Sequence, residues 1–280
     1  MSLPLIYLSD RRALFIGTPV ASRRLELAAS RLIVCLRGEL HYQVLGQQAS
    51  ATCSSLLLPV GLPVRIDSSQ AVIADCYLDV TGFDYAVLRQ QAHRCEQGIF
   101  SQLRDEERLR QTLLQLRDGD ASAAELWSSL EPLLNPPDLV QSMEFYCDPR
   151  VEQVIARIKR TARENLSLDE LAGSVGLSSS RLLSLFKQYV GIPIRRYRLW
   201  RRLHQATTLL AGGCSLTEAA LSSGFSDSPH FSRTFMDLLG FQPSLLIRSH
   251  CVVKTLVTPA KNAQREKDAT SPELAASSYK

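Results

Sequence analysis

The sequence contains no uninterrupted apolar run near the roughly 20 residues that a membrane-spanning helix requires. Its first residues, MSLPLIYLSDRR, lack the basic-then-apolar order of a signal peptide. The seven cysteines are scattered from Cys35 to Cys251 without a C-x-x-C pair, so neither a disulfide framework nor a zinc site is indicated. We therefore expect a cytoplasmic protein with reduced thiols and without a membrane segment, cofactor or bound metal.

The composition is that of an ordinary globular protein, with 45% hydrophobic and 21% charged residues, and 280 residues suffice for two domains. Charge is distributed unevenly along the chain. Residues 1–150 hold 14 Lys and Arg against 18 Asp and Glu, whereas residues 151–250 hold 13 against 7. This basic surplus favours a polyanionic partner, although a charge run alone is also typical of a solvated surface.

Residues 1–92 alternate short apolar segments with turns, which predicts several strands in a small β-barrel or sandwich. Residues 32–36 and 40–44 flank a glycine turn, so we expect them to pair as a hairpin. In residues 72–80 apolar and polar side chains alternate, which is typical of a strand with one face on the core.

From about residue 83 the apolar spacing becomes helical, and residues 93–138 are expected to be a helical dimerisation or linker region. Its apolar face comprises Ile99, Phe100, Leu103, Leu109, Leu113 and Leu116. We expect residues 99–134 to join two subunits; the alternative is that they only pack on the strands. Asn135-Pro-Pro137 breaks the chain before a helix from about Pro149 to Asn165, and we place a domain boundary near residues 138–148. Residues 251–280 are expected to form a flexible tail.

An internal repeat lies between residues 167 and 246. Residues 167–178, SLDELAGSVGLS, recur as residues 215–226, SLTEAALSSGFS. Both copies begin with S-x-x-E, a capping box that starts a helix, and both place a glycine, Gly176 or Gly224, where that helix must end. The serine that closes each copy is expected to cap a second helix. Two helices joined by a short glycine turn, present twice, form a duplicated helix-turn-helix.

Helical spacing divides the second helix of each copy into two faces. The core stripes are Leu182, Leu185, Phe186 and Tyr189 in the first copy and Phe231, Thr234, Phe235 and Leu238 in the second. The outward stripes are Ser180, Leu183, Ser184 and Lys187 in the first copy and Pro229, Ser232, Arg233 and Met236 in the second. Serine can donate to or accept from a base, and arginine pairs with guanine O6 and N7, so the outward stripes suit DNA. The alternative is the solvated surface of a structural bundle.

These residues resemble the DNA-binding domain of the AraC/XylS-type transcription regulators of bacteria. The likeness covers about residues 150–250 and includes L-S-x-S-x-L-x-x-x-F-K-x-x-x-G, from Leu177 to Gly191, followed by G-F-S-D and G-x-x-P in the second copy. The sequence departs from the family pattern at Pro229-His230, at Met236, where the family usually has lysine, and at Leu246-Ile247. These departures bear on the phosphate contacts and base preference of the second copy.

The resemblance implies an all-α DNA-binding domain over residues 139–250, in which a connecting helix, residues 194–211, spaces two recognition helices for successive major grooves about 34 Å apart. The candidates for base contacts are Ser180, Leu183, Ser184, Ser228, Pro229, His230, Ser232 and Arg233. The candidates for phosphate contacts are Ser167, Ser178, Lys187, Arg195, Arg196, Arg202, Ser215 and Ser226.

Residues 1–92 resemble the cupin-type sensor barrel that often precedes this domain, through the turn Leu58-Pro-Val-Gly61. A metal-binding cupin needs two closely spaced histidines and a glutamate, whereas His41 stands alone. Cys35, Cys53 and Cys76 all fall in expected strands. They act either as small buried hydrophobic residues or as a thiol or soft-metal sensor.

We thus expect an α+β protein with an N-terminal cupin-like β-barrel, dimerisation helices and a C-terminal domain with two helix-turn-helix units. Its expected function is that of a sequence-specific DNA-binding transcription activator, controlled by an unknown small-molecule or protein signal on the barrel. Double-stranded DNA, a second copy of the chain and RNA polymerase are the expected partners. The alternative is a cupin-type enzyme with an accessory helical domain, which would need convergent titratable side chains in the barrel.

Overall fold

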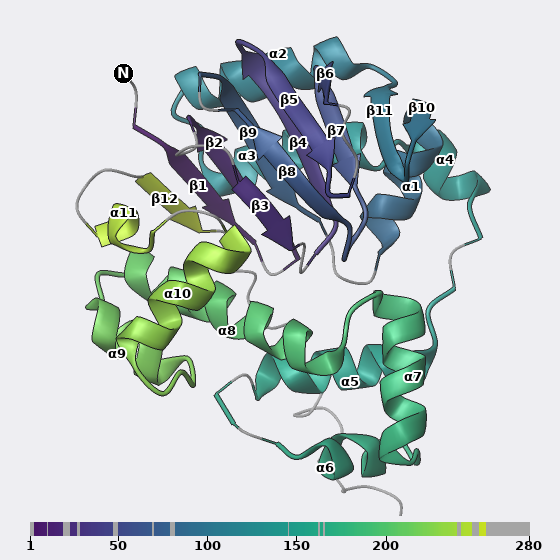
Figure 1. Cartoon of the computed structure of the whole chain (residues 1–280), viewed down its shortest axis with the longest axis vertical. Coiled ribbons are helices and arrows are strands. Elements are labelled where there is room, and N and C mark those ends of the chain that lie inside the picture. Colours follow the sequence, from purple (N-terminus) through teal and green to yellow (C-terminus); the bar gives the residue numbers. More distant parts are fainter. Residues whose placement is uncertain are drawn as a thin grey trace, which may run out of the picture.

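The computed structural model of the chain is a mixed α+β fold, with β-sheets in the upper part of Figure 1 and a group of helices below them. The residues that it describes are 3–9, 11–18, 23–26, 29–46, 50–68, 70–78, 82–144, 146–161, 163–164, 166–239, 242–247 and 252–255. Within these ranges, no helix combines the length and the apolar character needed to cross a membrane.

Two sheets form the upper part. The strands of the larger sheet are β1 (Leu5–Leu8), β2 (Ala13–Gly17), β4 (Arg31–Arg37), β7 (Ser55–Leu58), β9 (Val72–Tyr77), β10 (Ala92–Glu96), β11 (Ile99–Leu103) and β12 (Val252–Thr255). The strands of the smaller sheet are β3 (Arg23–Glu26), β5 (Leu40–Val44), β6 (Ala51–Cys53) and β8 (Pro63–Asp67). Their spatial orders are β10-β11-β7-β4-β9-β2-β1-β12 and β3-β8-β5-β6.

The expected hairpin of residues 32–36 and 40–44 is wrong, because these segments lie in different sheets. β4 pairs with β7 and β9, whereas β5 pairs with β6 and β8. Gly38 between them has a φ of 89° and turns the chain from one sheet into the other. The sequence signal for a tight turn was correct, but both strands found other partners because each is an inner strand of its own sheet.

The strand predicted in residues 72–80 is present as β9, but both of its faces are buried, so its polar residues do not mark a solvent-exposed face. Asp75 is buried and accepts a hydrogen bond of 2.9 Å from Nε of the buried Arg31. The Arg31 guanidinium lies 4.5 Å from the centre of the Tyr77 ring. An ion pair thus replaces solvent on this face. Residues 79–80 of the predicted strand lie outside the described residues.

The helices of the upper part are α1 (Phe83–Gln91), α2 (Glu106–Asp118), α3 (Ala123–Leu134) and α4 (Pro137–Ser142). Helices were predicted here, but the helical assignment is wrong for residues 93–96 and 99–103. These residues lie in β10 and β11, which pair through a turn at Gln97 and Gly98, both with positive φ. Spacings of four residues, such as Ile99 to Leu103, fit both a strand and a helix, so the apolar pattern alone could not separate them.

Helix α2 places its apolar face against its own chain. Leu109 and Leu113 are buried together with Leu126 and Trp127 of α3 and with residues of the larger sheet. The structure therefore supports the alternative in which this face packs on the strands, and Leu113 is not available to a second subunit. Self-association of the chain stays a prediction, without Leu113 as its contact.

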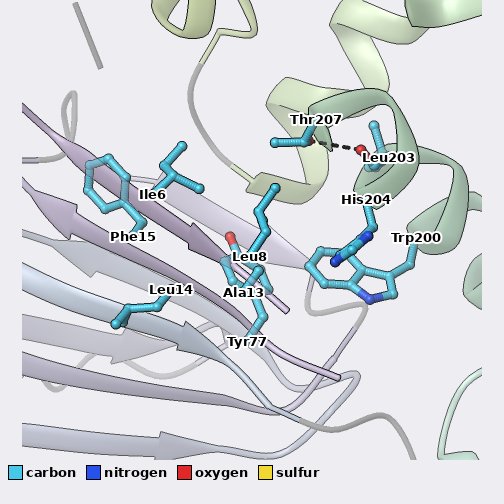
Figure 2. A pocket seen from close by; sticks show the side chains of 10 residues that line it. All are labelled: Ile6, Leu8, Ala13, Leu14, Phe15, Tyr77, Trp200, Leu203, His204 and Thr207. Atoms are coloured by element: carbon cyan, nitrogen blue, oxygen red, sulfur yellow. Dashed lines mark hydrogen bonds between the residues drawn. The ribbon is translucent and has the colours of Figure 1, made fainter. Parts of the chain in front are cut away.

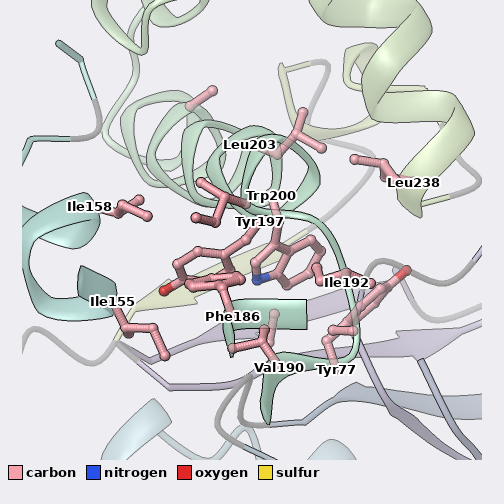
Figure 3. Close-up of a cluster of buried hydrophobic side chains, with 14 of the residues drawn as sticks. Tyr77, Ile155, Ile158, Phe186, Val190, Ile192, Tyr197, Trp200, Leu203 and Leu238 are labelled. Carbon is pink, nitrogen blue, oxygen red and sulfur yellow. The ribbon is translucent and has the colours of Figure 1, made fainter. Parts of the chain in front are cut away.

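The helices of the lower part are α5 (Pro149–Arg160), α6 (Leu168–Gly173), α7 (Ser179–Val190), α8 (Ile194–Ala211), α9 (Leu216–Ser222), α10 (Ser228–Leu239) and α11 (Ser244–Ile247). Their shared core is built on fully buried aromatic rings, among them Phe186, Tyr197, Phe231 and Phe235. Figure 3 shows the part of this core around α8. Helix α5 ends at Arg160, before Asn165, which lies outside the described residues.

The two parts are in direct contact. Trp200 of α8 stacks on Tyr77 of β9 with ring centres 4.9 Å apart (Figure 3). After the last helix, β12 pairs in parallel with β1, and Lys254 Nζ donates 2.8 Å to the carbonyl of Asp120. The prediction of a tail from residue 251 is therefore wrong for Val252–Thr255; residues 256–280 lie outside the described residues.

Candidate nucleic-acid interface

The first helix pair, α6 and α7, is held by the caps that its sequence predicts. The Ser167 Oγ accepts 3.1 Å from the Glu170 amide, and the Glu170 carboxylate accepts 2.6 Å from the Ser167 amide, which completes the capping box. Gly176 has a φ of 65° in the turn, and the Ser178 Oγ accepts 3.3 Å from the Arg181 amide at the start of α7. Each cap satisfies backbone N–H groups in the first turn of its own helix, so the start of both helices is fixed by residues close in sequence.

The second helix pair, α9 and α10, repeats this arrangement with one change. Ser215 and Glu218 again form a capping box, and Gly224 has a φ of 83°. The prediction that Ser226 caps α10 is wrong, because the Asp227 Oδ1 accepts 2.6 Å from the His230 amide instead. The second copy has one more residue than the first between the glycine turn and the cap of its second helix. Asp227 therefore takes the capping position that Ser178 has in the first copy.

The outward stripes of both second helices are accessible. On α7, Ser180, Leu183, Ser184 and Lys187 are exposed, while Leu182, Leu185 and Phe186 are buried. On α10, Pro229, His230, Arg233 and Met236 are exposed, Ser228 and Ser232 are half-buried, and Phe231, Thr234, Phe235 and Leu238 are buried. The assignment of faces from helical spacing is thus confirmed, except that Tyr189 of the core stripe and Ser232 of the outward stripe are both half-buried. Leu183 and Met236 keep 42% and 38% of their surfaces exposed although both are apolar.

The candidates for phosphate contacts differ in access. Ser167, Ser178, Lys187, Arg195, Ser215 and Ser226 are exposed, whereas Arg196 and Arg202 are half-buried. Burial lowers the pKa of Arg202, and its guanidinium lies against the turn at Gly224. Arg202 therefore joins α8 to the second helix pair, a packing role that its place in a basic run could not reveal.

One exposed charge near the predicted stripe was missed from the sequence. Arg181 lies in the first turn of α7, and its side chain is exposed. Helical spacing places it at the edge of the stripe that contains Ser180 and Ser184, so a strict rule of 0, 3, 4 and 7 positions omits it. A wider face of about 100° or more would have included it.

A cavity of about 700 Å³ lies at one end of the two sheets, beside the start of α2. Its lining includes Cys35, Cys53, Glu106, Glu107 and Arg110. Arg110 donates 2.7 Å to Glu107, and this hydrogen bond lowers the pKa of Glu107 to about 2. Among the described residues, the buried Oε1 of Glu106 has no hydrogen-bond partner. The cavity has the size and mixed lining of a small-molecule site.

The three cysteines predicted in strands lie in β4, β6 and β9, as expected. Burial raises the pKa of Cys53 and of Cys76 to about 12, and it also raises the pKa of Cys35. Since the thiolate is the reactive form, these environments suppress thiol chemistry. The His41 Nδ1 lies 3.0 Å from the Thr52 hydroxyl, and the part of the chain described holds no group of three metal-ligating side chains.

We expect iodoacetamide at pH 8 to alkylate the exposed Cys95 much faster than Cys53 or Cys76, because the latter two are almost entirely protonated at that pH. Mass spectrometry of peptides from the native protein, with urea-unfolded protein as the control, measures the difference. Labelling of Cys53 at the rate of the unfolded chain would contradict this account and favour a thiol sensor.

A second, smaller cavity of about 30 Å³ lies between the sheet and α8 (Figure 2). Ile6, Leu8 and Tyr77 line it from the strands, and Trp200 and His204 line it from α8. The His204 Nε2 is 2.8 Å from the carbonyl oxygen of Ser9. This volume holds about one or two water molecules. The cavity is therefore a packing defect between the sheet and α8, too small for an organic ligand.

Comparison with known proteins places the lower helices in a known class. A family model described as a helix-turn-helix domain matches residues 171–249. The HTH-type transcriptional regulators GbdR and ArgR of Pseudomonas aeruginosa are 34% and 33% identical to this chain over 96 residues, or 34% of its length. These matches cover 26% of GbdR and 29% of ArgR, so the chain spans little more than a quarter of either relative.

The fold as a whole is similar to that of ToxT from Vibrio cholerae O395, with a TM-score of 0.54 at 13% identity over 85% of this chain and 96% of ToxT. Residues 171–249 are thus a helix-turn-helix domain. The resemblance of this segment to the AraC/XylS-type transcription regulators of bacteria, which the sequence motifs predict, is confirmed.

Proposed function

We propose that the protein is a sequence-specific DNA-binding transcription regulator in which α6–α7 and α9–α10 are two helix-turn-helix units. The observation that carries the proposal is the pair of exposed outward stripes on α7 and α10, each on a helix whose opposite face is anchored by buried aromatic rings. Helix α8 connects the units and contributes a run of arginines. Such a basic helical surface with short polar side chains suits the major groove.

The sheets are proposed to form a cupin-like sensor. The cavity beside α2 is large enough for a small effector, and the contact between Tyr77 and Trp200 joins the sheet to α8. We further propose that the protein acts as a homodimeric activator that engages RNA polymerase. A protein that binds chromosomal DNA acts where that DNA is, which in bacteria is the cytoplasm. The similar proteins are named as transcription regulators, and none of these names favours an enzyme.

DNA affinity and its salt dependence test the proposal. A preferred duplex is first selected from a random pool with the full-length chain, and binding is then measured by fluorescence anisotropy between about 50 and 300 mM KCl. We expect log K to fall linearly with log salt, because each phosphate neutralised contributes about −0.9 to the slope. A chain that binds no duplex at low salt, while circular dichroism shows it folded, would refute the proposed function.

Two substitutions separate base reading from phosphate binding. We expect Arg233→Ala to cost about 1–3 kcal/mol on the selected duplex and to relax the preference at one base pair. Lys187→Ala should lower affinity for selected and unrelated duplexes by the same factor, because a phosphate contact carries no sequence information. The test is the affinity of each variant for the selected duplex and for an unrelated duplex. An equal loss on both duplexes for Arg233→Ala, and a loss on the selected duplex alone for Lys187→Ala, would show that the two roles are reversed.

A further inference from the structure

The basic surplus of residues 151–250 lies entirely in residues 151–211. These residues, which contain most of α5, the first helix pair and α8, hold eleven Lys and Arg against four Asp and Glu. Residues 212–250, which contain the second helix pair, hold two arginines against three acidic residues. A unit with this balance offers little to the DNA backbone, whose phosphates repel carboxylates and attract cations.

The difference is concentrated at equivalent positions of the two recognition helices. When the N-caps Ser178 and Asp227 are superposed in sequence, Lys187-Gln188 of α7 corresponds to Met236-Asp237 of α10. All four of these side chains are exposed. The second unit therefore has a neutral thioether and a carboxylate where the first has an ammonium and an amide. Arg233 is the one Lys or Arg on the described part of α10.

The exposed Met236 lies on the same stripe as Arg233 and Ser232, three and four residues away. It also lines an open groove of about 420 Å³, together with Leu216 and Pro243. In the major groove of DNA the apolar feature is the C5-methyl group of thymine. Methionine is flexible and adapts to such a methyl group, whereas it gains nothing beside a phosphate.

We infer that the two units bind DNA unequally: α5, α7 and α8 hold the phosphate backbone, while α10 reads bases with almost no phosphate neutralisation, placing Met236 against a thymine methyl group. This inference rests on the proposed function. It makes Met236 a specificity-determining residue of the second half-site. The division of labour also means that the first half-site alone carries most of the salt dependence.

A reciprocal exchange at the equivalent positions tests the unequal charge. In the full-length chain, Lys187→Met should weaken binding and make the salt slope shallower by about 0.9. Met236→Lys should steepen the slope by about 0.9 and strengthen binding to unrelated duplexes, while on the selected duplex it also loses the thymine contact. Each variant is the matched control of the other, because both exchange the same two exposed side chains. If Met236→Lys changes neither affinity nor slope, α10 does not approach DNA through this stripe and the inference fails.

Ethylation interference locates the phosphates directly. With the wild-type chain, ethylated phosphates should block binding mainly in one half-site. With Lys187→Met, the interference should weaken in that same half-site. Equal interference in both half-sites would overturn the inference while leaving the proposed function intact. Loss of all binding by the wild-type chain would instead refute the proposed function itself.

Thymine substitution tests the contact of Met236. Each thymine of the second half-site is replaced in turn by deoxyuridine, which lacks only the methyl group. We expect one position at which deoxyuridine lowers the affinity of the wild-type chain about fourfold, which is the value of one buried methyl group. At the same position, deoxyuridine should leave the affinity of Met236→Ala unchanged. Equal losses for wild-type and Met236→Ala at every thymine would show that Met236 reads no methyl group.

Discussion

Replacing Trp200 with alanine is expected to lower the free energy of unfolding by about 3–5 kcal/mol and to separate the unfolding of the sheets from that of the helices. The indole is 7% exposed and stacks on Tyr77, with ring planes 25° apart, in the joint between β9 and α8. Its removal enlarges the small cavity that already lies there. We expect contacts across this joint to make the two regions of the wild-type protein unfold together.

The chain carries a reporter for this experiment. Trp127 lies in a different core, between α3 and the larger sheet, so in Trp200→Ala the remaining tryptophan fluorescence follows the upper part alone. We expect its urea transition to differ from the transition seen by circular dichroism, whereas the two should coincide for wild-type protein. Trp200→Phe, which keeps an aromatic ring, should retain most of the stability. Coincident transitions in Trp200→Ala would show that the joint does not couple the two parts.

Replacing Arg12 with methionine is expected to destabilise the sheet region by about 3–5 kcal/mol, because it removes the buried counter-ion of Asp84 and leaves only the exposed Arg11, 3.9 Å away, as a cation beside that carboxylate. Arg12 is 5% exposed and donates 2.6 Å to each oxygen of Asp84, which is wholly buried. It also pairs with Glu131. Burial lowers the pKa of Arg12, but the hydrogen bonds and charges of these two carboxylates outweigh burial and raise it.

The companion variants separate the loss of charge pairing from the loss of packing. Asp84→Asn in the Arg12→Met background should recover part of the stability, because a neutral amide costs less to bury than a carboxylate. Glu131→Gln alone should cost about 1 kcal/mol or less, since the Glu131 side chain is 48% exposed. Urea midpoints give the differences. A deficit in Arg12→Met that Asp84→Asn does not reduce would mean that packing dominates.

The sequence by itself was enough for features that depend on neighbours along the chain. The capping boxes at Ser167 and Ser215 and the glycine turns depend on residues that are close in sequence. The local sequence is therefore enough to predict their backbone geometry. The buried and outward faces of α7 and α10 follow from helical spacing in the same way. The family motif belongs to the same local kind of information.

Features that depend on contacts between distant residues were decided only by the tertiary structure. An apolar pattern does not specify which segment a strand pairs with, so the pairing of β4 with β9 and the strand at residues 99–103 could not be derived from the sequence. Asp75 pairs with Arg31, 44 residues away, and Leu113 turns to its own sheet. The free energy of such contacts depends on which surfaces meet, and that is a property of the whole fold.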